Sequence, residues 1–217
     1  MNPLIENILN EPQAYYYVSE IQRILKQESL KRKEFYEKIT PNDKAEFING
    51  EIIFQSPVKL KHNRATLLLV KVLDTFVYKL KAGLVGFEKL LISLTRNDYE
   101  PDICYFSQEK AKKFKPNQMQ FPAPDFVVEI LSSSTENIDR IIKFKDYAAH
   151  GIAEYWIIDP ENQTIEQYIL KNGVYQLFLK SNNGEIESVV IKGFRIPIQA
   201  IFNEKINMET LDKIIRY

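Results

Sequence analysis

Glu129 is the residue whose surroundings in the sequence point most directly to chemistry. It lies inside Phe-Val-Val-Glu-Ile-Leu, residues 126–131, an apolar run of strand length. A carboxylate buried in such a strand loses several kcal/mol of hydration free energy unless a cation or a charged partner compensates it. Glu129 would need no function if it reached solvent at the end of the strand or formed an ion pair with Lys or Arg. A metal ligand explains it better, because a second carboxylate is available on another predicted strand.

Asp102 supplies that second carboxylate. It follows Pro101 at the start of a predicted strand, residues 102–106. Carboxylates from two neighbouring strands can chelate Mg²⁺, which prefers oxygen ligands and keeps several waters. The chain has a second Pro-Asp pair at residues 124–125. Asp125 is four positions from Glu129 and would point the same way on a strand, so it is an alternative to Asp102.

The helix predicted after Glu129 carries further charged groups. It follows a Ser/Thr-rich segment at residues 132–135 and runs to about His150, where Gly151 ends it. Its buried stripe is predicted to comprise Ile141, Phe144 and Ala148, with Tyr147 at the margin. Asp139 and Lys143 lie four residues apart beside that stripe, which makes them neighbours on the helix surface. By themselves they indicate an ordinary surface ion pair that adds little stability.

A strand–helix–strand unit carries these residues. The strand at residues 126–131, the helix, and a strand at residues 153–158 follow one another directly. A crossover of this kind makes the two strands parallel and the connection right-handed. We therefore expect the Glu129 strand in the interior of a sheet, which explains its continuous apolar sequence.

The other elements surround this unit. Residues 45–54 predict a hairpin with a tight turn at Asn49-Gly50. Residues 62–81 predict a long helix, and residues 84–94 one strand or two. A loop is expected at residues 107–124, a hairpin at 164–180 and a strand at 186–191. Residues 1–44 are interpreted as an N-terminal helical extension and residues 45–217 as a single domain.

The charge of the chain limits how it could bind nucleic acid. Its 29 basic and 29 acidic residues give a formal net charge of zero. Attraction to a polyanion must therefore come from a local patch. The loop at residues 107–124 offers one, and we expect its lysines to contact phosphates: Lys110, Lys112, Lys113 and Lys115. A solvated Lys-rich loop without such a role is the alternative.

Cys104 is the single cysteine, which excludes an intrachain disulfide and a cysteine-based zinc knuckle. Its neighbours are typical of a strand, so a buried thiol is expected. Residues 1–10 lack the pattern of a signal peptide. No segment approaches the roughly 20 apolar residues that span a bilayer. We expect a cytoplasmic protein with no membrane partner.

The combination of these motifs resembles the Uma2 family, a branch of the PD-(D/E)XK restriction-endonuclease-like superfamily. The resemblance extends from about Glu46 to Asp159. The residues that carry it are Glu46 with Asn49-Gly-Glu51, His62, Pro101-Asp102, Val128-Glu-Ile-Leu-Ser132 with Ser134-Thr135, Asp139, Lys143, Tyr147, Gly151, Glu154-Tyr-Trp156 and Asp159-Pro160.

The resemblance implies an α/β (α+β) fold: a mixed central sheet flanked by helices, with C-terminal antiparallel strands as an extension. It implies that Asp102 and Glu129 bind Mg²⁺ or Mn²⁺. The superfamily's usual Glu-x-Lys would need a lysine at position 131, where this chain has Leu131. The Uma2 pattern places the lysine on the following helix, which matches Lys143 as the third catalytic residue.

Four further residues are auxiliary candidates under the same resemblance. They are Glu46, similar to an acidic residue contributed by an early element, His62 at the border of the site, Asp139 beside Lys143, and Lys145 as the alternative lysine. The resemblance implies a metal-dependent nuclease that hydrolyses phosphodiester bonds. Its partner would be nucleic acid, DNA ahead of RNA, and a homodimer is a compatible assembly. The alternative is a catalytically silent nucleic-acid-binding or assembly module, because a fold does not fix a function.

Overall fold

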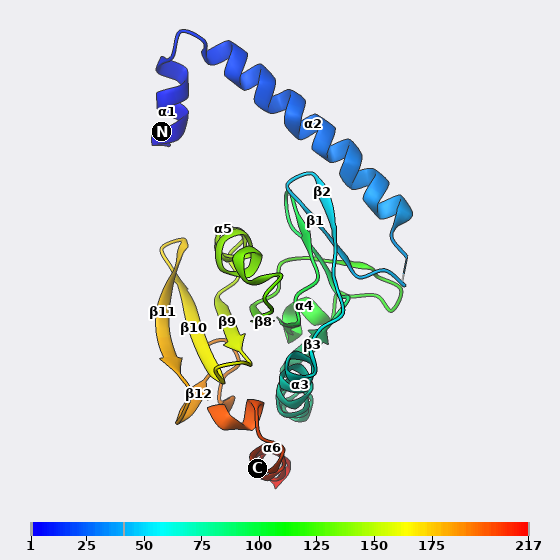
Figure 1. Ribbon diagram of the computed structural model, residues 1–217, viewed down its shortest axis with the longest axis vertical. Helices are drawn as coiled ribbons and strands as arrows, with labels where there is room; N and C mark the ends of the chain where they lie inside the picture. Colours follow the sequence, from blue (N-terminus) through cyan, green and yellow to red (C-terminus); the bar gives the residue numbers. More distant parts are fainter. Residues whose placement is uncertain (1, 41, 217) are drawn as a thin grey trace. The chain divides into compact units, whose positions relative to one another are not determined.

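A computed structural model describes residues 2–40 and 42–216 of the chain (Figure 1). The chain forms two compact units. The N-terminal unit comprises residues 1–55 and 95–99, and the main unit comprises residues 56–94 and 100–217. Among the described residues, no helix combines the length and apolar character that crossing a membrane requires.

The N-terminal unit is a pair of helices with a small antiparallel sheet. Its elements are α1 (Pro3–Asn10), α2 (Ala14–Lys38), β1 (Ala45–Ile48), β2 (Glu51–Phe54) and β5 (Asp98–Tyr99). Strand β1 pairs with both β2 and β5. Asn49 and Gly50 connect β1 to β2 with φ angles of 52° and 86°. Both angles are in the left-handed region, as a type I′ hairpin turn requires, and the predicted hairpin is confirmed.

The helix α2 is tied to these strands by charge and by packing. Arg32 donates hydrogen bonds to both oxygens of the buried Asp98, at 2.6 and 2.9 Å. Phe35 packs against Phe47 of β1, with ring centroids 5.8 Å apart. Because of these contacts, the hairpin groups with the N-terminal helices, whereas the sequence placed it at the start of the main domain.

The main unit is built on a six-stranded mixed sheet. Its strand order is β11-β10-β9-β8-β6-β3, and Figure 1 shows β11, β10 and β9 side by side. The bounds are β3 (Gly83–Phe87), β6 (Ile103–Ser107), β8 (Phe126–Ile130), β9 (Glu154–Asp159), β10 (Thr164–Lys171) and β11 (Val174–Ser181). Strands β8 and β9 are parallel and the other neighbours antiparallel. The parallel pair confirms the predicted strand–helix–strand unit.

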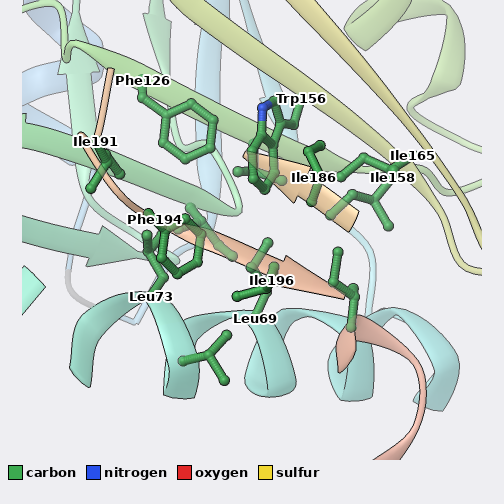
Figure 2. Packing of buried hydrophobic residues seen from close by; sticks show 14 of the residues in the cluster. Leu69, Leu73, Phe126, Trp156, Ile158, Ile165, Ile186, Ile191, Phe194 and Ile196 are labelled. Carbon is green, nitrogen blue, oxygen red and sulfur yellow. The ribbon is translucent and has the colours of Figure 1, made fainter. Parts of the chain in front are cut away.

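The hydrophobic core fills one face of this sheet. Helix α3 (Leu60–Leu80) contributes Leu69 and Leu73, which point toward Phe194 and Ile196 (Figure 2). The same core contains Phe126, Val128 and Ile130 of β8 and Trp156 and Ile158 of β9. The C-terminal elements close it: β12 (Glu185–Glu187), β13 (Arg195–Pro197), η2 (Ile198–Ile201) and α6 (Glu204–Arg216). The sequence predicted a strand at residues 186–191 and none of the elements beyond it.

The other face of the sheet is covered by the helical segment between β8 and β9. It is a π-helical turn, η1 (Ile138–Lys143), followed directly by α5 (Phe144–Ala149). The predicted buried stripe was wrong in part, since Ile141 is 52% exposed. Ala148 of the predicted stripe is buried, and Asp139, Lys143 and Tyr147 are buried as well. Asp139 and Lys143 lie within the π-helical turn and are its buried residues.

The predicted loop at residues 107–124 is folded. It contains α4 (Gln108–Ala111) and β7 (Gln120–Phe121), which pairs in parallel with β4 (Leu91–Ser93). Phe114 packs edge-on against Phe106 and Phe121, with ring centroids 4.9 and 5.1 Å apart. This aromatic cluster anchors the loop to the sheet.

Candidate active site

Glu129 lies on the face of β8 opposite to the hydrophobic core. Strand alternation puts Phe126, Val128 and Ile130 into the core, so Glu129 points to the side covered by η1 and α5. The side chain is only 3% exposed. A carboxylate at this depth requires compensating partners.

Lys143 and Tyr147 are those partners. The Lys143 ammonium lies 3.0 Å from Glu129 Oε1, and the Tyr147 hydroxyl donates a hydrogen bond of 2.8 Å to the same oxygen. Lys143 and Tyr147 are themselves buried. They lie four residues apart, one at the end of the π-helical turn and one in α5, and therefore face the same strand.

Asp139 completes an ionic triad. Its Oδ1 lies 3.1 Å from the Lys143 nitrogen, and its side chain is 2% exposed. The pair is therefore buried, unlike the ordinary surface ion pair that the spacing alone indicates. Burial raises the pKa of the Tyr155 hydroxyl well above its ordinary value, and the charges of Glu129 and Asp139 raise it further. Tyr155 thus stays protonated and donates to the backbone carbonyl of Asp139 at 3.2 Å.

Asp102 is held by a separate set of donors. Its Oδ2 accepts a hydrogen bond of 2.8 Å from the Ile130 backbone N–H and lies 3.2 Å from His62 Nε2. Burial alone raises the pKa of Asp102, but the hydrogen bonds from His62 and Ile130 and the charge of Lys143 outweigh burial and lower it. Asp102 is therefore ionised at neutral pH.

The sheet register brings Asp102 and Glu129 together. Ile103 of β6 pairs with Val128 of β8 in antiparallel register. One step further, Asp102 stands opposite Glu129, and opposite positions in an antiparallel pair place their side chains on the same face. Both carboxylates also interact with Lys143, Glu129 by contact and Asp102 through its charge.

The remaining candidates have other positions. Asp125, the alternative to Asp102, lies at the opposite end of β8, where it accepts from the Ser107 N–H at 2.7 Å and pairs with Lys110 at 2.8 Å. Lys145 is exposed on α5. Glu46 is buried in β1 of the N-terminal unit. The buried thiol of Cys104 is confirmed, and burial together with the charge of Glu129 raises its pKa.

The donor chemistry of the site fits a divalent metal ion. Asp102, Glu129 and Asp139 are buried carboxylates, and Lys143 supplies one compensating charge. Three carboxylates and one ammonium leave an excess negative charge that a divalent cation would balance. Across residues 2–40 and 42–216, no cluster of three or more His, Cys, Asp or Glu side chains is arranged around a common metal position. An ion held by Asp102 and Glu129 would complete its shell with other oxygens, as Mg²⁺ usually does.

Two contacts of the site were missed or misjudged from the sequence. Tyr147 was placed at the margin of a core stripe, and Asp139 was named as an auxiliary candidate although its spacing from Lys143 alone indicates a surface pair. The signal that could have found them is their spacing from Lys143, because residues at i−4 and i+4 share its helix face. A helix that buries a lysine against Glu129 must bury these neighbours too.

Comparisons with known proteins place the chain in a family and a fold. A crystal structure from Anabaena variabilis, described as "a putative nuclease belonging to DUF820", superposes with a TM-score of 0.68 and 22% identity. The match covers 82% of this chain and 97% of that one, and it shows a common fold. The "Uncharacterized protein sll1609" of Synechocystis sp. is 31% identical over 156 residues, 69% of this chain and 86% of that protein. The model of the Uma2 family, described as "Putative restriction endonuclease", matches residues 32–199, and the chain belongs to that family.

Proposed function

We propose that the protein is a metal-dependent nuclease that hydrolyses phosphodiester bonds of nucleic acid, at the site formed by Asp102, Glu129 and Lys143. The observation that carries the proposal is the buried triad of Glu129, Lys143 and Asp139 beside an ionised Asp102. An inert core has no use for this charge, since apolar side chains of similar volume would be no less stable.

Asp102 and Glu129 would hold Mg²⁺ or Mn²⁺. When bound, such an ion activates water and neutralises charge on the phosphoryl oxygens. The protein orients both carboxylates in advance: the Ile130 N–H and His62 hold Asp102, and Tyr147 holds Glu129. Donors fixed by the fold need no reorganisation during the reaction.

Lys143 would supply a fixed positive charge next to the scissile phosphate. Its ammonium is 3.0 Å from Glu129 and therefore adjacent to any ligand of that carboxylate. A buried ammonium acts through a lower effective dielectric than one in water, which strengthens its attraction to developing negative charge.

DNA is the first substrate to test, because the family description names restriction endonucleases, and RNA is the alternative. One site per chain cuts one strand, so cleavage of both strands would use two copies, and a homodimer is the assembly we expect. The zero net charge favours a second candidate, a silent nucleic-acid-binding module, since the chain lacks the overall positive field of many nucleases.

Cleavage assays on duplex DNA, single-stranded DNA and RNA with Mg²⁺ and Mn²⁺ test the proposal. We expect Asp102→Asn and Glu129→Gln to lower the rate roughly 10²-fold or more while the fold is kept. Asp125→Asn is the matched control. It removes the carboxylate next to the other end of β8, outside the proposed site, and should retain cleavage. Nucleic-acid binding without cleavage of any substrate would favour the silent module.

A further inference from the structure

The Lys143 ammonium has two carboxylate partners at nearly equal distances. It lies 3.0 Å from Glu129 Oε1 and 3.1 Å from Asp139 Oδ1, and each side chain is at most 3% exposed. A single carboxylate would already neutralise one ammonium. The second therefore needs an explanation, because each buried charge carries its own desolvation cost.

Metal binding at Glu129 supplies that explanation. An ion on Glu129 competes with Lys143 for the same carboxylate oxygens, and the two cations repel each other. If the pair with Glu129 were the one close ion pair lost and Asp139 were absent, the buried ammonium would lose its carboxylate contact, which is strongly unfavourable. Asp139 removes this penalty, because the ammonium keeps an ion pair after Glu129 has turned to the metal.

The position of Asp139 does not depend on Glu129. Its backbone carbonyl accepts the hydrogen bond from Tyr155, on the neighbouring strand β9. The next residue, Arg140, donates to both carboxylate oxygens of Glu166 in β10, at 2.8 and 3.2 Å. The π-helical turn is thus fixed at two consecutive residues, and the carboxylate of Asp139 stays in place when Glu129 changes partner.

We propose that Asp139 is a positioning residue that retains the Lys143 ammonium in the site while Glu129 binds a divalent metal ion. This role rests on the proposed metal-dependent function. Lys143 bridges Glu129 and Asp139 in this structure, and in the metal-loaded protein it keeps the ion pair with Asp139. The lysine charge thereby remains beside the reacting phosphate instead of competing for the metal ligand.

The affinity for Mn²⁺, measured by isothermal titration calorimetry, tests this role without any cleavage assay. Asp139→Asn should weaken Mn²⁺ binding about tenfold or more in the wild-type background, because Lys143 then loses its ion pair with the Asp139 carboxylate. In the Lys143→Met background the same substitution should have a clearly smaller effect, about threefold or less, because no ammonium remains to be held. Asp139→Glu, which keeps the charge, should restore most of the affinity.

The matched control is Glu136→Gln. Glu136 pairs with Arg140 at 2.9 Å with the same i, i+4 spacing in the same segment, but it is half exposed. It should leave the Mn²⁺ affinity within about twofold. If Asp139 acted only through its negative charge, Asp139→Asn would weaken Mn²⁺ binding by the same factor with and without Lys143. That result would overturn the proposed role of Asp139 and leave the metal-dependent function standing. Absence of Mn²⁺ binding by the wild type would overturn the metal-dependent function and this role with it.

A structure of the Mn²⁺-loaded wild type provides a second measurement, which does not need Lys143→Met to fold. The proposal expects the Lys143 nitrogen within ion-pair distance of Asp139 and separated from the metal-bound oxygens of Glu129. A lysine that leaves Asp139 for solvent, or that stays on the same Glu129 oxygen, would contradict it.

Discussion

Lys143 illustrates, at the scale of one residue, how burial changes the meaning of an ordinary sequence pattern. An Asp and a Lys four residues apart form exposed ion pairs on many helices, and such pairs add little to stability. Here the same spacing occurs with both side chains nearly inaccessible to water. The pair is therefore part of a site, and its removal has consequences that a surface pair would not have.

We predict that Lys143→Met lowers the free energy of unfolding by about 3–5 kcal/mol, because it leaves two buried carboxylates without their cation. It should also lower the cleavage rate roughly 10²-fold, the scale of losing one electrostatic stabiliser. Urea unfolding monitored by circular dichroism measures the first effect. The control is Lys38→Met, which removes the same charge from the exposed pair with Glu34 and should cost under about 1 kcal/mol. Equal losses for the two variants would show that Lys143 is not a buried counter-ion.

The residues of the site differ in how visible they are in the sequence. Glu129 could be predicted because a single charge within an apolar strand is a local signal. Asp102 was chosen with Asp125 as its alternative, because alternation puts Asp125 on the Glu129 face whereas Asp102 lies on another strand. Their separation depends on the antiparallel pairing of β6 with β8, which places Asp102 opposite Glu129. Strand pairing of this kind is long-range and leaves no mark in the local sequence.

At the scale of elements, η1 determines which side chains face the sheet. The helix between β8 and β9 was predicted, but its buried face only in part, because the apolar stripe was followed and the buried polar residues Asp139 and Lys143 of η1 were not. The hairpins and the parallel pair were predicted because their turn residues and lengths are local properties. The ion pair that holds η1 comes from Glu166 of β10, which also pairs with Lys180 of β11, and both strands lie later in the chain.

Glu166 is the centre of these ion pairs. It accepts from Arg140 of η1 and from Tyr168, and it pairs with Lys180 of β11 at 2.9 Å. Burial alone raises the pKa of Glu166, but these donors outweigh burial and lower it from 4.5 to about 2. The ionised form is therefore the one that stabilises the fold. Its contribution is complete above pH 4.5 and is lost as the pH falls toward 2.

We predict that Glu166→Gln lowers the free energy of unfolding at pH 7 by about 3 kcal/mol, the value that corresponds to this pKa difference. The difference from the wild type should shrink as the pH is lowered from 4.5 toward 2, because the wild-type carboxylate then becomes neutral as well. Urea unfolding of the wild type and the variant, from pH 7 down to pH 2, measures the loss at neutral pH and its decrease in acid. A difference that is constant with pH would mean that the lost free energy comes from hydrogen-bond geometry and not from charge.

At the scale of the whole molecule, the net charge of zero restricts how a nucleic acid could be bound. Without an overall positive field, affinity has to come from a local group of cations. The folded segment at residues 107–124 offers lysines on a rigid base, since Phe114 fixes it to the sheet. Lys110 is not among them, because it pairs with Asp125 and donates to the Ala123 carbonyl. The exposed lysines of this segment are Lys112, Lys113 and Lys115.

We predict that replacing Lys112, Lys113 and Lys115 together by Ala weakens binding of duplex DNA and reduces its salt dependence. Each lysine that contacts a phosphate contributes about −0.9 to the slope of log K against log salt concentration, because counter-ions are released. Loss of three contacts should therefore reduce the magnitude of that slope by about 2–3. Fluorescence anisotropy at several salt concentrations measures it, with the metal ion omitted to prevent cleavage. The control replaces three other exposed lysines: Lys171, Lys192 and Lys205. The control changes the net charge equally, so the same reduction in both triple variants would trace the effect to total charge. An unchanged slope in the first variant would exclude this segment as the phosphate-binding surface.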